Sequence, residues 1–185
     1  MGQYYRIIFL KAEDSDSSTK ATVDIIECWT EPHAYEEGSK LMEHSYLNTD
    51  MMKDIEYHLS PEGALYRSRL VWAGDYAVEE KGRDMNLYHM CKEESSGKKM
   101  TSSNVCYTTD CQYILNHTKK QYVDKKNLPN DIHPLPLLTS DGNGAGSGDF
   151  RGTDEILCGD WARDVISMER VLPEGYTELV CRFEE

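Results

Sequence analysis

The chain has 185 residues, of which 39% are hydrophobic and 12 are tyrosines, a length and composition that suit one folded domain with its own core. Its formal net charge of −13 at pH 7 repels phosphate backbones, so generic nucleic-acid binding is disfavoured. No apolar run is long enough to span a membrane, and the start "MGQYYRIIFL" lacks the basic opening and cleavage site of an export signal. We therefore expect a cytoplasmic protein with no membrane association and a single globular domain over residues 1–185.

The first half of the chain begins with strand signals. Residues 3–10 and 21–29 are β-branched and aromatic, and the polar turn at 13–20 between them predicts an antiparallel pair. The clearest helix is expected at 50–59, where apolar residues recur at helical spacing, at Met51, Met52, Ile55 and Leu59. A shorter helix is expected just before it, at 40–47.

Further strands are expected in the second half of the chain, at 69–74, 86–90, 111–124 (a hairpin), 156–172 and 176–183. The segment 128–138 contains three prolines and is expected to be extended but not a central strand. Residues 93–105 have little to bury and are expected to form a mobile loop. There is no alternation of strands and helices, so the sequence predicts an α+β fold, a largely antiparallel sheet with one or two helices packed on it.

The glycine-rich segment 140–152 reads "SDGNGAGSGDFRG". It lacks the Lys-Ser/Thr pair of a phosphate loop, and its G-x-G-x-G-x-G spacing differs from the dinucleotide fingerprint. An EF-hand would require Glu at position twelve, where this chain has Gly152. What remains is a loop with exposed amides, whose candidate binding residues are Asn143, Asp149 and Arg151. An ordinary loop salt bridge between Asp149 and Arg151 is the alternative.

Two short segments, "WAGDYA" at 72–77 and "GDWAR" at 159–163, place Gly-Asp beside an aromatic residue at the edge of an apolar run. We call them the Gly-Asp corners. In one interpretation both carboxylates face a single pocket, and the candidate ligand-binding residues are Trp72, Asp75, Asp160, Trp161 and Arg163. In the other, each aspartate only accepts backbone amides in a turn.

The histidines and cysteines show no metal pattern. The six histidines lack H-x-x-x-H and H-E-x-x-H spacings, and the six cysteines are irregularly spaced without a C-x-x-C pair, so neither a metal nor a cofactor is expected. The cysteines are expected to be free thiols, as in a reducing compartment. His117 and His133 are the two histidines that we consider as site residues, although a lone histidine is more often a packed or surface residue.

Positive charge gathers in one part of this acidic chain. Residues 95–126 carry six lysines against Asp110 and Asp124, a local charge of +4. A solvated hairpin is the ordinary explanation of such a run, and a small anion-attracting face is the alternative. In the second interpretation, Lys119 and Lys120 attract an anionic group of the ligand.

Five segments carry a family resemblance: "MGQYY" at 1–5, "KLMEH" at 40–44, "VWAGDYA" at 71–77, the block at 133–152, and "GDWARDVISME" at 159–169. In this order, over nearly the whole length, the chain resembles a family of proteins encoded in bacterial and phage genomes. No activity is assigned to that family, so the resemblance implies no catalytic residue. It implies that the glycine-rich block and the Gly-Asp corners belong to one recurring design. The insertion-like segment 91–111 departs from the family.

Three functional hypotheses follow. The leading one is a cytosolic binding module for a small polar or anionic, nucleotide-like ligand, which in a phage setting would sequester a host signalling nucleotide. The second is a hydrolase that uses paired carboxylates with His117 or His133 as acid or base. The third is an inhibitor that binds another protein through its acidic surface. The sequence leaves homo-oligomerisation open.

Overall fold

The computed structural model describes residues 2–11, 24–93, 97–101, 109–142 and 157–183. Over these residues the strands are β1 (Tyr5–Leu10), β2 (Ile26–Thr30), β3 (Ser68–Gly74), β4 (Lys98–Lys99), β5 (Tyr113–Asn116), β6 (Gln121–Asp124), β7 (Ser140–Asp141), β8 (Val165–Glu169) and β9 (Thr177–Glu178). The α-helices are α1 (Leu41–His44), α2 (Asp50–Leu59), α3 (Leu87–Met90) and α4 (Pro134–Leu138), and two 3₁₀ helices are η1 (Pro32–Tyr35) and η2 (Lys125–Asn127).

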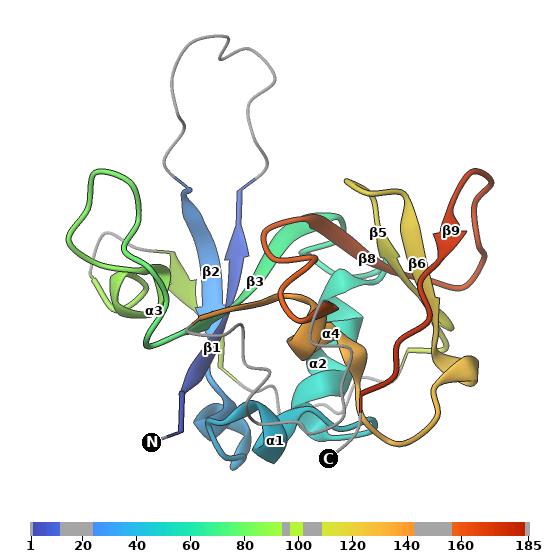
Figure 1. The fold of residues 1–185 in the computed structure, drawn as a ribbon, viewed down its shortest axis with the longest axis horizontal. Helices are drawn as coiled ribbons and strands as arrows, with labels where there is room; N and C mark the ends of the chain where they lie inside the picture. Colours follow the sequence, from blue (N-terminus) through green and yellow to red (C-terminus); the bar gives the residue numbers. More distant parts are fainter. Residues whose placement is uncertain (1, 12–23, 94–96, 102–108, 143–156, 184–185) are drawn as a thin grey trace, which may run out of the picture.

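The described strands form one open, mixed sheet in the order β4-β2-β1-β3-β8-β5-β6-β9, with β7 paired to β3 (Figure 1). Every pairing among the longer strands is antiparallel. The three parallel pairings each involve a two-residue strand: β4 on β2, β7 on β3, and β9 on β6. The predicted α+β class is therefore confirmed, with four helices in the described residues where one or two were expected.

Strand β1 is buried on both faces of the sheet, which explains its uninterrupted apolar sequence. Tyr5, Ile7 and Phe9 lie in the larger hydrophobic cluster, which also contains the apolar residues of α2 and α4. Ile8 and Leu10 alternate with them and lie in a second cluster, which α3 covers. Figure 1 shows α3 at the β1–β2 end of the sheet, and α2 and α4 near β8.

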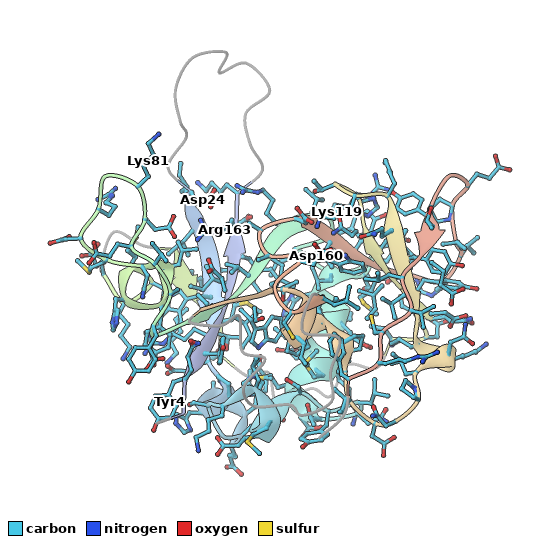
Figure 2. The ribbon with its side chains drawn as sticks, viewed as in Figure 1. Tyr4, Asp24, Lys81, Lys119, Asp160 and Arg163 are labelled. Carbon is cyan, nitrogen blue, oxygen red and sulfur yellow. The ribbon has the colours of Figure 1, made fainter. Side chains whose placement is uncertain are left out.

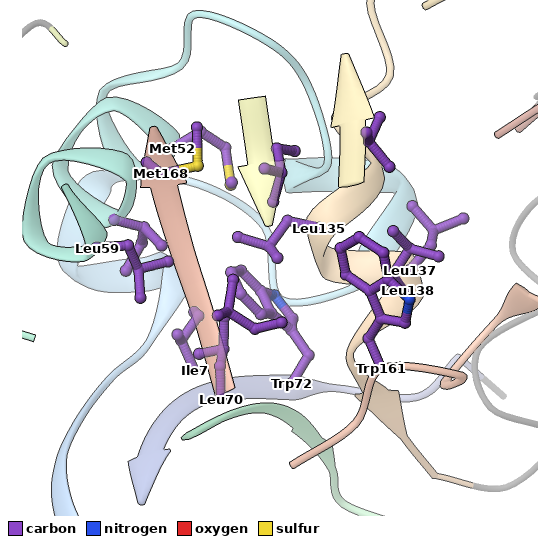
Figure 3. Packing of buried hydrophobic residues seen from close by; sticks show 14 of the residues in the cluster. Ile7, Met52, Leu59, Leu70, Trp72, Leu135, Leu137, Leu138, Trp161 and Met168 are labelled. Atoms are coloured by element: carbon purple, nitrogen blue, oxygen red, sulfur yellow. The ribbon is translucent and has the colours of Figure 1, made fainter. Parts of the chain in front are cut away.

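Strand β3 continues this alternation at the centre of the sheet. Its Leu70 and Trp72 point into the larger cluster, and both side chains are fully buried. Figure 3 shows them beside Ile7, with Trp161 close to the leucines of α4. The far edge of β3 is shared, because β8 pairs with residues 68–69 and β7 with residues 72–73. The second Gly-Asp corner thereby lies next to the centre of the sheet.

The predicted helix at 50–59 is confirmed as α2. Thr49 caps it by accepting a hydrogen bond from the Met52 amide at 3.2 Å. The expected apolar face is buried in the core. The shorter helix expected at 40–47 is α1, a single turn.

Two expectations were wrong. Residues 86–90 form helix α3 instead of a strand, because Asn86 caps the His89 amide and its own amide group bonds the carbonyls of Asp75 and Ala77. The segment at 128–138 is not extended throughout, because its last five residues form α4. Proline is compatible with the first helical turn, where its missing N–H has no partner to lose.

The β1–β2 pair, the strand at 69–74 and the β5–β6 hairpin are confirmed. The strands expected at 156–172 and 176–183 are present but shorter, as β8 and β9. In the expected mobile loop at 93–105, Lys98 and Lys99 pair with β2 as β4, and residues 94–96 and 102–105 lie outside the described residues. In the part of the chain that the structure describes, no helix has the length and apolar character needed to cross a bilayer.

Candidate functional site

The β5–β6 hairpin divides its side chains between the core and the opposite face of the sheet. Ile114 pairs with Val123 and Met168, and all three lie in the larger hydrophobic cluster. The register therefore turns the alternate residues of these strands to the other face, and they are Tyr113, Leu115, Tyr122, Asp124, Ser167 and Glu169. Strand β5 ends at Asn116, and the turn of the hairpin begins at His117, whose amide donates to the carbonyl of Val165 at 2.8 Å.

His117 is the centre of a hydrogen-bonded cluster on this face. Its Nδ1 lies 2.7 Å from the hydroxyl of Tyr176, and its Nε2 lies 2.7 Å from the hydroxyl of Ser167. Glu169 accepts hydrogen bonds from Ser167 at 2.9 Å and from Tyr66 at 2.7 Å. Four segments that are distant in the sequence thus meet around one half-buried imidazole.

Two exposed cations approach this cluster from separate turns. The Arg67 guanidinium lies 5.3 Å from the ring centroid of Tyr66, and the Lys120 ammonium lies 5.1 Å from that of Tyr176. Both residues have positive φ, 60° and 55°, a conformation uncommon for side chains of this size. Within the described residues neither cation forms an ion pair with a carboxylate.

We name this set the His117 face, and its members are Tyr66, Arg67, His117, Lys120, Ser167, Glu169 and Tyr176. The pKa of His117 is lowered to about 4, first by burial and then by the charges of Arg67 and Lys120, against the opposing effect of Glu169. The imidazole is therefore neutral at pH 7. Counting Arg67, Lys120 and Glu169, the face carries a net charge of +1, on a chain of net charge −13.

Lys119 and Asp160, two other predicted site residues, lie together but not on the His117 face. The Lys119 ammonium is 2.7 Å from the Asp160 carboxylate, and Figure 2 shows the two labelled side by side. Beside them, the indole of Trp161 donates to the Gln121 side chain at 2.9 Å. The hairpin and the second Gly-Asp corner therefore pack against each other.

Arg163 lies on the other side of the same corner, surrounded by carboxylates from three segments. Its guanidinium contacts Asp24 at 2.8 Å, Glu80 at 2.6 Å and Asp141 at 2.8 Å. Burial opposes its charge, but the hydrogen bonds of Glu80 and Asp141 raise the pKa of Arg163 above its usual range. The guanidinium thus forms an ion pair with each of the three carboxylates, so Arg163 holds the three segments together.

Three predicted site residues lie in the core. Trp72 and His133 are fully buried, as is Trp161. Trp72 donates its indole N–H to His44 at 3.1 Å. His133 caps α4 and lies 2.9 Å from the Glu56 carboxylate. These side chains stabilise the interior and do not line an open surface.

The two Gly-Asp corners do not face each other. Asp75 accepts a hydrogen bond from the backbone amide of Tyr4 at 3.1 Å, and Figure 2 places Tyr4 well away from Asp160. Asp75 therefore accepts a backbone amide, as the second interpretation expects, but this amide belongs to Tyr4 and not to the turn of Asp75 itself. The candidates Asn143, Asp149 and Arg151 lie outside the described residues.

Sequence reasoning identified His117 and Lys120 but missed the other members of the His117 face. Ser167 and Glu169 alternate with the core residues Ile166 and Met168, so a strand at this position predicts that they share one face. Nothing local in the sequence connects them to the hairpin. Tyr66 and Tyr176 have no local signal at all.

Among the described residues, no group of three or more His, Cys, Asp or Glu side chains is arranged to hold a metal ion. No protein-family model matches the chain, and the searches of curated proteins and of solved structures also found no match.

Proposed function

We propose that this protein is a cytosolic binding module for a small anionic, nucleotide-like ligand, and that the His117 face is its binding site. One observation carries the proposal. Two cations without a carboxylate partner among the described residues, Arg67 and Lys120, converge on a neutral, half-buried histidine. In an acidic protein such cations attract an anion locally, even though the net charge disfavours it at long range.

The chemistry of the face suits a ligand with both a ring and an anionic group. Arginine and lysine bind phosphate or carboxylate oxygens through charge-assisted hydrogen bonds. The tyrosine rings offer surfaces on which a planar base can stack. Tyr113 and Tyr122 lie on the same face of the sheet, with their ring centroids 5.9 Å apart, and extend this aromatic surface along the hairpin. In a bacterial or phage setting such a module would sequester a nucleotide without altering it.

The hydrolase hypothesis has less support. It requires paired carboxylates near a histidine, but Asp75 is held by the Tyr4 amide and Asp160 by Lys119. Two hydroxyls lie 2.7 Å from His117, those of Tyr176 and Ser167. The serine side chain is fully buried and donates to Glu169. A buried serine hydrogen-bonded in this way cannot reach a substrate as a nucleophile.

Thermal denaturation with AMP tests the proposal, with uncharged adenosine as the control ligand. A ligand that binds only the folded state at a hundred times its Kd stabilises it by about 2.7 kcal/mol, a shift of several degrees in Tm. We expect AMP to raise the Tm of the wild-type protein, and adenosine to do so much less. Chromatography of the released ligand should return unchanged AMP.

Variants locate the site. Arg67→Gln and Lys120→Gln should each weaken the stabilisation by AMP, and the double variant should abolish it. The matched control is Lys126→Gln, which removes an exposed lysine just beyond the same hairpin and should behave as the wild type. If AMP stabilises no form of the protein, or stabilises the double variant and the wild type equally, the proposed function is wrong.

A further inference from the structure

The direction of each hydrogen bond around His117 follows from its partners. The ionised Glu169 can only accept, so the Ser167 hydroxyl, 2.9 Å away, must donate its single proton to it. The Ser167 oxygen is then an acceptor toward His117, 2.7 Å away. Neutral His117 therefore carries its proton on Nε2, and its Nδ1 is a bare acceptor.

Tyr176 completes the chain of donors and acceptors. Its hydroxyl lies 2.7 Å from the bare Nδ1 of His117, so it donates its proton inward. Consistent with this direction, the Lys120 ammonium donates to the same phenol oxygen from the other side, at 3.4 Å. With His117 neutral, Tyr176 therefore presents only acceptor capacity to anything that approaches the face.

We propose that Tyr176 is the specificity-determining residue of the His117 face, and that protonation of His117 switches its hydroxyl from acceptor to donor. Protonated His117 carries N–H on both nitrogens, so its Nδ1 donates to Tyr176 and the phenol proton turns outward, where it can bind an anion. This inference rests on the proposed function and concerns the same site.

The charged and titratable groups that face His117 determine how strongly its protonation and the binding of an anion affect each other. Arg67 and Lys120 oppose the proton, Glu169 favours it, and Tyr176 accepts or donates according to it. An anion bound between the two cations offsets their charge and so raises the pKa of His117. By reciprocity, protonation must tighten the binding of the anion by the same factor.

The switch also constrains the ligand at neutral pH. With the Tyr176 proton held inward, a ligand gains most when it offers an N–H or O–H donor to the phenol oxygen and an anionic group to the cations. An amino-bearing nucleobase with a phosphate has this combination. A ligand with acceptors alone is favoured only when His117 is protonated.

Sulfate is a suitable probe for the switch, because its charge stays constant over the range of the titration. Calorimetry at about pH 7.5 and about pH 5 should show binding to the wild-type protein about four- to tenfold tighter at the lower pH, the factor expected for a rise of about 1.5–2 units in the pKa of His117. Tyr176→Phe should still bind sulfate but with a smaller pH dependence than the wild type, because only the coupling through the charges of Arg67 and Lys120 remains. Tyr76→Phe, which alters an exposed tyrosine outside the His117 face, is the matched control and should behave as the wild type.

The outcomes separate the two proposals. If sulfate binds at neither pH, both the proposed function and the switch are overturned. If it binds with equal affinity at both pH values, or if Tyr176→Phe keeps the full pH dependence, the site stands and the switch is wrong. Nitrogen-15 NMR of the ligand-free protein gives a second test, with the proton of His117 expected on Nε2 at neutral pH. A proton on Nδ1 would overturn the switch without any ligand.

Discussion

Acidification should destabilise this fold through His44. The imidazole is fully buried, and its two nitrogens bond the Gly38 carbonyl at 2.9 Å and the Trp72 indole N–H at 3.1 Å, which fixes the neutral form. Burial lowers the pKa of His44 from 6.5 to about 4. The unfolded chain therefore takes up the proton first, and stability is lost as the pH falls from 6.5 toward 4. Between pH 7 and pH 5 the free energy of unfolding should decrease by about 2 kcal/mol from this residue.

Urea denaturation followed by circular dichroism at these two pH values measures the loss. His44→Gln keeps a donor and an acceptor but no titratable group, so its stability should depend on pH by about 2 kcal/mol less than that of the wild type. The matched control, His33→Gln, replaces an exposed histidine and should retain the wild-type dependence. An equal loss of stability in the wild type and in His44→Gln would refute the reasoning.

Three further changes probe the charged groups. Burial raises the pKa of Glu56, but its hydrogen bonds with His133 and then Lys125 outweigh burial and lower the pKa to about 2. The stability that the ionised Glu56 contributes is therefore lost as the pH falls from 4.5 toward 2. Glu56→Gln should cost about 2–3 kcal/mol in urea denaturation at pH 7, and a loss below about 1 would contradict the ion pair. Arg163→Met leaves three carboxylates facing one another and should cost about 2–4 kcal/mol by calorimetry, and an unchanged Tm would exclude the network. Lys119→Ala should cost less than about 1 kcal/mol because the pair with Asp160 is partly exposed, and a double-mutant cycle measures the coupling, which should not exceed that figure.

The elements that the sequence predicted well are those with strong local patterns. The apolar runs of β1 and β3, the four apolar residues of α2 and the hairpin at 111–124 each contain enough residues to establish a period. The segment 86–90 is too short to establish one, and its helix depends on the Asn86 cap. In the segment 128–138, three prolines argued against a helix, but two of them stand at the first and third positions of α4, where a helix tolerates proline.

The candidate site was predictable only in part, for a related reason. His117 and Lys120 stand out locally, within a basic hairpin. Their partners Tyr66, Ser167 and Tyr176 are brought to them by pairings between strands that are far apart in the sequence, and no local pattern encodes such contacts. Trp72 and Trp161 were expected to bind the ligand, but the buried His44 and the half-buried Gln121 accept their indole N–H groups and allow both rings to lie in the core.

The net charge of −13 conceals how the charges are arranged, and the arrangement decides what the surface can bind. Four arginines each have a carboxylate within 4 Å, and these are Arg6, Arg69, Arg163 and Arg170. Their charge is neutralised locally and contributes to holding segments together. Arg67 and Lys120 differ, because in the described part of the chain they lie over tyrosine rings and have no carboxylate within ion-pair distance. An anion near the His117 face therefore meets two available cations at close range, where the screened negative charges elsewhere on the molecule have little effect.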